Sequence, residues 1–431
     1  MPAAVVARFV AFVFVLMVAV LSAREPADAM PAFAREYGVS CNVCHAAYPR
    51  LNDFGDRFAG EMNYRLPNWR EHTVQTGDEQ LALAEWLPLA ARVQAFVQSR
   101  DGESIDPVSG EVTADSNLDF QAPYLVKLLS SAPLTDNISY YFYMIFAEKG
   151  ANTEVIVEDA WFSYDDLFGT GISAQLGQFQ VSDLMFPREI RMTFQDFMAY
   201  RFAGITYDRG LLFGRGIGPL DVSLGFVNGN GIEQNYNINS PGYRRPDKLF
   251  DNDTNKSVFG RVGTTLGSAS IGLFGLSGEQ RNAVGPAGMD TGDRDTDKTV
   301  LGIDASGRLA DRWYWFGQYL WNSWDGFLDP AVDYEWSGGF AGVDFVRDDK
   351  WVFSALVNFA DAGDLDNTDT IYEGIDIRTL TFAGAYYFMR NVKGVIELNI
   401  DLLDDVPQSG QYYTGHLSPE NYILFGIDAA F

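Results

Sequence analysis

The stretch Val395–Leu402, with the sequence VIELNIDL, decides the fold because its side chains alternate in character. The even-numbered positions are isoleucine and leucine, whereas the odd-numbered positions are valine, glutamate, asparagine and aspartate. A period of two residues indicates a β-strand whose two faces meet different environments. One face suits lipid and the other suits water, as in the strands of a membrane barrel. Leu89–Gln98 and Thr299–Leu309 show the same alternation.

Turn residues divide the chain from residue 85 onward into sixteen such segments. We expect strands at 87–99, 118–131, 137–148, 154–165, 171–181, 202–213, 219–228, 255–267, 269–278, 297–308, 311–323, 335–347, 350–361, 375–389, 392–404 and 420–431. An even number of strands lets a bacterial barrel close with both ends on the periplasmic side. The long connections, such as 229–254, 279–296, 362–374 and 405–419, would then face outside, and the short ones the periplasm.

The sequence therefore predicts an all-β fold, an antiparallel transmembrane β-barrel of about sixteen strands. The last strand ends on Phe431 and resembles the C-terminal signature of bacterial outer-membrane proteins. A soluble β-sandwich or propeller is the alternative. Connections that alternate between short and long argue against it, as do the aromatic strand ends Tyr140–Phe142 and Trp313–Trp315, which suit a membrane interface.

Composition narrows the classes of protein further. The 431 residues carry a net charge of -27, which argues against nucleic-acid binding because phosphate is neutralised by lysine and arginine. Two cysteines are too few for a disulfide scaffold. The 14% aromatic share and the 42 glycines suit a β-protein with many turns and interfacial rings.

The N-terminus has the features of a signal peptide, which we assign to residues 1–29. Arg8 precedes an uncharged apolar run, and Ala27-Asp28-Ala29 is a small-x-small cleavage pattern. We expect cleavage after Ala29, with Ala23 as the second choice. An uncleaved anchor is the alternative, but the run is shorter than the ~18–20 apolar residues that a membrane-spanning helix needs. The chain is therefore expected to be exported.

Cys41-Asn42-Val43-Cys44-His45 is a C-x-x-C-H motif, and this spacing predicts one covalently attached haem c. The two thiols would form thioethers with the haem vinyl groups, and His45 would be the proximal iron ligand. A disulfide across this short gap would add little stability. A zinc site would need a further ligand, and only His72 is near; a redox dithiol would need a thioredoxin-like context.

The second axial ligand of the haem iron is open at this point. Met62 lies 18 residues after Cys44 and is the first candidate, and His72 is the alternative. Met30 and His416 carry the same ligand types, and an open or water-bound position is the remaining possibility. A thioether ligand would raise the haem potential, and a second histidine would lower it.

Two domains follow from these observations. Residues 30–84 would form a monohaem cytochrome c domain with short helices, and residues 85–431 the outer-membrane barrel. A domain of this size is marginal unless haem and a neighbour bury it. We therefore expect it to plug the periplasmic mouth of the barrel.

Residues 29–64, AMPAFAREYGVSCNVCHAAYPRLNDFGDRFAGEMNY, resemble the N-terminus of the fused monohaem cytochrome–porins of iron-oxidising bacteria. The matching positions are Ala29, Pro31, Phe33-Ala34-Arg35, Gly38, Cys41, Cys44, His45, Tyr48-Pro49, Leu51, Phe54-Gly55, Phe58 and Tyr64. The chain departs from the family at Ala59 and Asn63. Leu176–Phe179, with Glu158–Ala160 upstream, also resembles phosphate-selective porins.

The resemblance implies a protein of the bacterial outer membrane that carries electrons from extracellular Fe(II), through the haem, to a periplasmic c-type cytochrome. Such a protein would be an iron:cytochrome oxidoreductase embedded in outer-membrane lipid. Two alternatives stay open. One is a substrate porin whose haem domain is a plug, and the other is a conduit that donates electrons to an external acceptor.

The expected loops are rich in aspartate. Their acidic positions are Asp251, Asp253, Asp290, Asp293, Asp295, Asp297, Asp364, Asp366 and Asp369. Carboxylates suit hard cations, and a negative field would concentrate Fe(II) near the surface. Simple solvation, or bridging of surface lipids through divalent ions, is the alternative explanation.

Overall fold

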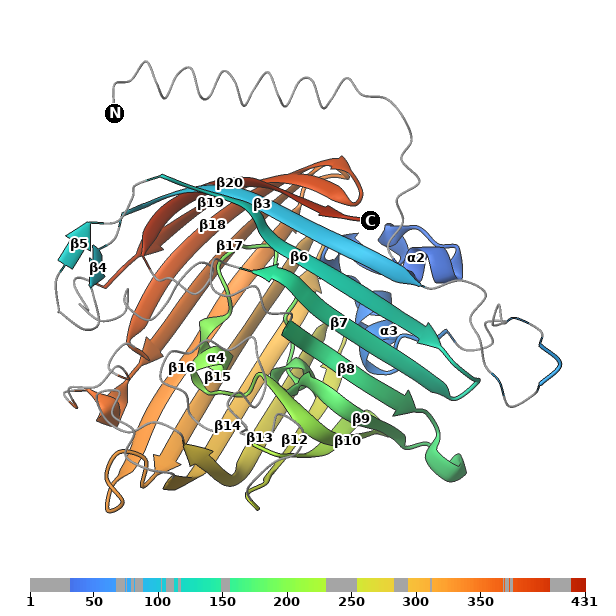
Figure 1. Cartoon of the computed structure of the whole chain (residues 1–431), viewed down its shortest axis with the longest axis horizontal. Helices are drawn as coiled ribbons and strands as arrows, with labels where there is room; N and C mark the ends of the chain where they lie inside the picture. The colour runs from blue at the N-terminus through green and yellow to red at the C-terminus, as the bar shows by residue number, and fades with distance from the viewer. Residues whose placement is uncertain are drawn as a thin grey trace.

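The computed structural model contains a closed barrel of sixteen antiparallel strands, which confirms the predicted fold (Figure 1). It describes residues 32–66, 74, 76–78, 81, 88–101, 103–105, 112–114, 118–148, 156–229, 254–282, 294–310, 312–366, 368, 372, 375–403 and 420–431. In the described residues, no helix is both long enough and apolar enough to cross a bilayer.

The barrel strands follow one another around the ring in chain order. They are β3 (Leu89–Asp101), β6 (Asp119–Pro133), β7 (Ile138–Glu148), β8 (Ile156–Tyr164), β9 (Ser173–Gln180), β10 (Tyr207–Ile217), β11 (Leu220–Val227), β12 (Ser257–Leu266), β13 (Ala269–Asn282), β14 (Arg294–Leu309), β15 (Trp313–Asp325), β16 (Asp333–Val346), β17 (Trp351–Asp361), β18 (Ile377–Met389), β19 (Val392–Asp401) and β20 (Asn421–Ala430). Pairing of β20 with β3 closes the ring. Phe431 and Ala91 exchange backbone hydrogen bonds at 2.8 and 2.6 Å beside this seam.

The predicted alternation appears as an apolar outer surface and a polar inner one. On β19, Ile396 and Leu398 point outward and are 46% and 43% exposed, whereas Glu397 and Asn399 are fully buried inside the barrel. A soluble sandwich would bury the apolar face instead, so this arrangement excludes that alternative. It is the arrangement that a barrel in lipid needs.

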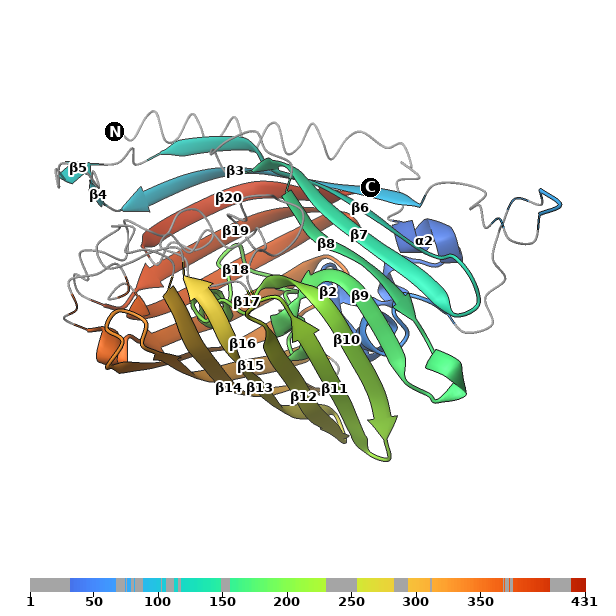
Figure 2. The ribbon, with the colours of Figure 1, turned by 60° about the horizontal axis from the view of Figure 1, so that its bottom comes forward.

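One predicted strand boundary is wrong for a physical reason. The strand expected at 202–213 begins only at Tyr207, as β10, because residues 181–206 leave the wall and fold into the barrel. We call this segment the infolded loop. It contains the 3₁₀ turn η3 (Val181–Leu184) and the helix α4 (Met198–Phe202), which lies inside the ring of strands (Figures 1 and 2). A small hairpin, β4 (Glu103–Ile105) with β5 (Val112–Ala114), is also additional to the prediction.

Buried polar groups of the wall hold the infolded loop in place. The Glu397 carboxylate accepts hydrogen bonds from the backbone N–H groups of Phe194 and Gln195, the latter at 2.8 Å. On β17, the side-chain oxygen of Asn358 accepts from Met198 N at 3.1 Å, and its side-chain nitrogen donates to Asp196 O at 3.0 Å. The loop backbone thus finds partners inside the lumen, as buried backbone groups require.

Residues 32–66, which we call the plug, lie at the barrel end that carries the short turns (Figure 2). The plug contains α2 (Ala32–Tyr37), the 3₁₀ turn η1 (Cys41–Val43), the small strands β1 (His45–Ala47) and β2 (Arg50–Leu51), and α3 (Asp53–Gly60). Its own core is a set of rings: Phe33, Tyr37 and Tyr64 lie 5.3, 5.6 and 5.8 Å from Phe58 between centroids. Short helices in this region were predicted.

Polar contacts and two ring stacks, of Tyr64 on Tyr141 and on Trp161, join the plug to the barrel wall. Tyr64 stacks on Tyr141 of β7 with 4.6 Å between centroids. Arg65 donates to Asp165 through two nitrogens, at 3.1 and 2.9 Å, in the turn that follows β8. Arg50 and Asp344 of β16 form an ion pair in which both side chains are almost completely buried. A segment too small to bury its own residues therefore depends on the barrel.

The Arg50–Asp344 pair gives a test of plug docking. Arg50→Ala leaves a buried carboxylate without its cation, a change that costs about 3–5 kcal/mol. We expect this variant to expose the plug to limited proteolysis between residues 32 and 66 while the barrel stays intact.

The double variant Arg50→Met/Asp344→Asn removes both charges and should recover much of the protection, because no ion is then left unpaired. Wild-type resistance of the Arg50→Ala variant to proteolysis would contradict this account of docking.

Candidate functional site

The Cys-x-x-Cys-His motif forms a tight turn on the plug. Val43 N donates to Ser40 O at 3.0 Å, and Cys44 N donates to Cys41 O at 3.3 Å. Both thiols are free and half-buried. Burial raises the pKa of both thiols, and for Cys44 the neighbouring Cys41 raises it further.

His45 is oriented as a metal ligand would be. Its Nδ1 lies 2.9 Å from the carbonyl oxygen of Pro49. Since a carbonyl only accepts, Nδ1 carries the proton and Nε2 keeps its lone pair. Burial lowers the pKa of His45 to about 4, so the ring is neutral at ordinary pH. A neutral imidazole held through Nδ1 by a backbone carbonyl is a usual arrangement for metal-binding histidines. The residues present therefore fit a haem held by Cys41, Cys44 and His45.

Asn52 hydrogen-bonds to the backbone of the motif, a role that the sequence did not predict. Its side-chain amide donates to Val43 O at 2.8 Å and to Asn42 O at 3.3 Å. Its backbone N–H donates to Cys44 O at 2.8 Å, and its side-chain oxygen caps α3 through Gly55 N at 2.9 Å. An asparagine directly before a helix is a recognised N-cap signal. The second set of contacts, to the motif, has no local signature.

Gly55 lets α3 approach the motif closely. A Cβ at this position would lie 2.0 Å from the carbonyl oxygen of Cys44 and 2.9 Å from Cδ2 of Leu51. Glycine inside a helix normally costs about 1 kcal/mol relative to alanine. The close contact explains why this helix contains one.

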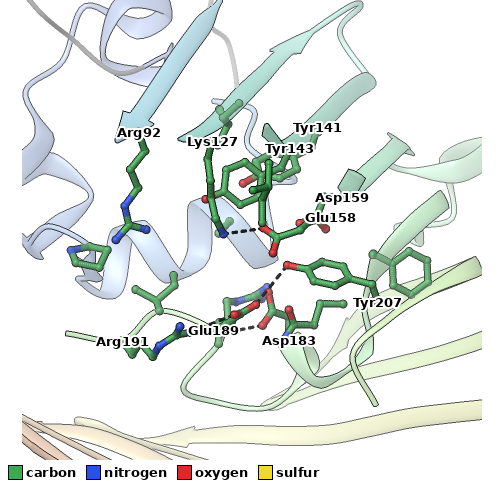
Figure 3. Close-up of a pocket in the computed structure, with 18 of the residues that line it drawn as sticks. Arg92, Lys127, Tyr141, Tyr143, Glu158, Asp159, Asp183, Glu189, Arg191 and Tyr207 are labelled. Carbon is green, nitrogen blue, oxygen red and sulfur yellow. Dashed lines mark hydrogen bonds and ion pairs between the residues drawn. The ribbon is translucent and has the colours of Figure 1, made fainter. Parts of the chain in front are cut away.

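A cavity of about 310 Å³ lies inside the barrel beside the plug (Figure 3). His45, Pro49, Ala59 and Tyr64 line it from the plug, and the barrel wall and the infolded loop supply the other lining residues. Charged groups of both signs converge on it: Arg92, Lys127, Glu158, Asp159, Asp183, Arg188, Glu189 and Arg191. Lys127 pairs with Glu158 at 2.7 Å, and the Tyr207 hydroxyl donates to Glu189 at 3.3 Å. The cavity places His45 next to a polar internal chamber.

The candidate second axial ligands remain predictions. Met62 follows the C-terminal end of α3, and its N–H donates to Arg57 O at 3.0 Å. It lies seven residues beyond Gly55, the α3 residue that contacts the motif, and two residues past the end of the helix. His72, the alternative, lies outside the described residues, as do Met30 and His416.

Acidic residues meet at the barrel end opposite the plug. Asp361 at the end of β17, Asp366 and Asp376 each place one carboxylate oxygen within 4.8 Å of the others. Burial raises the pKa of Asp376, and the neighbouring Asp366 and Asp361 raise it further. Asp366 was among the predicted acidic loop residues, whereas Asp251, Asp253, Asp290, Asp293 and Asp369 lie outside the described residues. Such carboxylates offer oxygen ligands to a hard cation.

Comparison with known proteins places the barrel among the porin-type folds. The outer-membrane channel DcaP of Acinetobacter baumannii is 12% identical with a TM-score of 0.54, covering 80% of this chain and 97% of that one. An anion-selective porin from Comamonas acidovorans is 13% identical with a TM-score of 0.53, covering 80% and 99%. OmpF of Salmonella typhi, in complex with daunomycin, is 12% identical with a TM-score of 0.52, covering 80% and 97%. No protein-family model and no curated protein sequence matches.

The contact at Gly55 gives a test of the motif's geometry. Gly55→Ala gains about 1 kcal/mol of helix propensity but forces an overpacked contact that costs about 1–3 kcal/mol. We expect α3 to move away from Cys44, and the purified protein to carry less haem per chain by absorbance.

Arg57→Ala is the matched control because Arg57 lies on the same helix with its side chain 61% exposed. It should keep the wild-type haem content. A Gly55→Ala protein with full haem content would show that the close approach has no role in haem binding.

Proposed function

We propose that this protein carries electrons across the bacterial outer membrane, from extracellular Fe(II) to a periplasmic c-type cytochrome, through one covalent haem c. The observation that carries the proposal is the His45 Nδ1 contact with Pro49 O, within a C-x-x-C-H motif, on a plug docked in a barrel. A channel has no evident need for an oriented imidazole next to two free thiols. An electron carrier needs all three residues.

The apolar outer surface of the barrel supports location in a lipid bilayer. The solved structures with the same fold include proteins described as outer-membrane channels and porins, which supports the outer membrane in particular. The plug would then lie at the periplasmic end, because short turns face the periplasm in such barrels.

Different residues of the plug would bind the haem, ligate its iron and position the motif. When bound, haem c supplies a one-electron redox centre. Cys41 and Cys44 would form the two thioethers, and His45 would ligate the iron through Nε2. Asn52 and Gly55 would position the motif turn, and Met62 or His72 would provide the second axial ligand. The buried ion pair of Arg50 with Asp344 would keep the site fixed relative to the membrane.

The acidic residues at one end of the barrel and the exposed apolar residues at the other suit the proposed electron donor and electron acceptor. The net charge of -27 and the carboxylates opposite the plug would concentrate Fe(II) on the outer side. At the plug end, which would face the periplasm, Val43 within the motif and Phe54 of α3 are 40% and 36% exposed. A periplasmic cytochrome could approach the haem edge at this apolar patch. The activity would be that of an iron:cytochrome oxidoreductase.

A substrate porin with a haem plug is the second candidate, and the fold comparisons favour it. The solved structures named above are described as channels and porins, one of them anion-selective. Arg188 lines the cavity and could attract an anion, whereas Lys127 and Arg92 there are paired with Glu158 and Asp428. A conduit that donates electrons to an external acceptor would have the same architecture as the proposed Fe(II)-oxidising carrier. The two differ only in the direction of electron flow.

Anaerobic mixing with Fe(II) tests the proposal. We expect the haem absorption bands of the detergent-solubilised protein to show reduction within seconds, and the Cys41→Ala variant to lose the covalent haem. Ion conductance in planar bilayers is measured in parallel. A haem that stays oxidised, together with high conductance, would favour the porin instead. Absence of haem bands would refute the haem assignment.

A further inference from the structure

Buried aromatic rings form a chain that crosses the inside of the barrel, beginning at the plug. The guanidinium carbon of Arg50 lies 4.5 Å from the ring centroid of Tyr314 and 4.9 Å from that of Phe316. Tyr314 and Phe316, both on β15, are 5.9 Å apart. Arg50 belongs to β2, which pairs with the strand that contains His45. The chain of rings therefore starts within a few residues of the proposed iron ligand.

The infolded loop supplies the middle of this chain. Phe197 lies 5.5 Å from Phe316 and stacks on Phe340 of β16, with 4.2 Å between centroids and an angle of 2°. Tyr200 of α4 lies 6.5 Å from both Phe197 and Phe340. These rings are all at least 96% buried. The infolded loop therefore contacts both β15, through Phe316, and β16, through Phe340.

The outer part of the chain reaches the mouth opposite the plug. Phe202, on α4 with Tyr200, lies 6.4 Å from Trp336, and Trp336 lies 5.5 Å from Trp324. Trp324 in turn contacts Phe327 at 5.2 Å and Tyr372 at 6.0 Å. Leu365 and Ile375, which directly precede Asp366 and Asp376, belong to the same buried cluster. The rings thus end beside the acidic residues.

Two tryptophans of this chain are unusual for an apolar core. Trp324 and Trp336 are 0% and 3% exposed, and neither indole N–H has an acceptor among the residues that the structure describes. A buried donor without a partner costs free energy, which phenylalanine or leucine in the same space would avoid. An indole, however, gives up an electron more readily than a phenyl ring. Packing alone does not account for tryptophan at both positions.

We propose that these rings, from Tyr314 to Tyr372, are the electron path between the outer mouth of the barrel and the plug. The inference rests on the proposed function, in which one haem lies at one end of the barrel. Tyr314 and Trp324 are ten residues apart on β15, or about 33 Å at ~3.3 Å per residue, too far for one direct transfer. The rings lie 4.2 to 6.5 Å apart on either side of α4, and the helix itself carries the step from Tyr200 to Phe202.

The transfer balances as a single-electron exchange. One electron would leave extracellular Fe(II), giving Fe(III), and would reduce a ferric haem held by the plug to the ferrous state. No bond is formed or broken, and no proton needs to move. Each ring returns to its starting state after the electron has passed.

The test compares variants of the full haem-loaded protein in sealed vesicles with the long-loop end outside. Trp324→Leu/Trp336→Leu removes both indoles, and Trp324→Phe/Trp336→Phe keeps the packing but not the readily oxidised rings. Trp321→Leu is the matched control, because Trp321 lies on the same strand but faces outward with 47% exposure. Stopped-flow absorbance follows haem reduction after addition of Fe(II) outside.

We expect haem reduction to slow at least tenfold in the leucine pair, to slow less in the phenylalanine pair, and to match wild type in Trp321→Leu. The haem spectrum, the midpoint potential and reduction by dithionite trapped inside the vesicles should be equal in all four proteins. Wild-type rates in the leucine pair would overturn the path.

Failure of the proposed Fe(II) oxidation can be distinguished from failure of the electron path. If external Fe(II) does not reduce the wild-type haem, iron oxidation is refuted, but the path is still tested in the other direction. The haem is then reduced beforehand, and external ferricyanide is the acceptor. Slower oxidation in the leucine pair would support the path, and equal rates in all variants would overturn it.

Discussion

Closure of the sheet between β20 and β3 is the constraint on which the rest of the structure depends. A membrane-spanning sheet can have no open edge, because its backbone groups would lack partners in lipid. A ring of sixteen strands, however, encloses a lumen too wide for its own side chains to fill. The infolded loop occupies one part of the lumen, and the plug lies at the end that carries the short turns. Polar residues of the inner wall, such as Glu397 and Asn358, bind the loop that fills it.

The same constraint explains where the proposed haem site lies. A segment of 35 residues cannot bury a redox centre alone, so the plug takes its surroundings from the barrel. Arg50 contacts β16, and Tyr64 and Arg65 contact the hairpin of β7 and β8. His45 consequently faces an internal chamber, while Cys41 and Cys44 stay near the surface. This is the placement that a link between the lumen and a periplasmic partner requires.

Local periodicity made the barrel predictable. Each strand shows its two faces within eight to sixteen residues, and all sixteen predicted strands are present. The motif of Cys41, Cys44 and His45 could also be found from the sequence because its spacing is local, and the haem that it predicts stays a prediction. The infolded loop was not, because its partners Asn358 and Glu397 lie more than 150 residues away in sequence. The roles of Asn52 and Gly55 in positioning the motif were also missed. Both residues contact the backbone of the motif, and such contacts produce no recognisable spacing of residue types in the sequence.

The central claim is that the plug holds one covalent haem, and mass spectrometry of the purified protein tests it most directly. Trypsin cleavage after Arg35 and Arg50 releases the peptide of residues 36–50, which contains both cysteines and His45. The account predicts that this peptide carries the mass of one haem through two thioether bonds. Recovery of the peptide with free thiols, or with a disulfide, from protein made in a host that matures c-type cytochromes would contradict it.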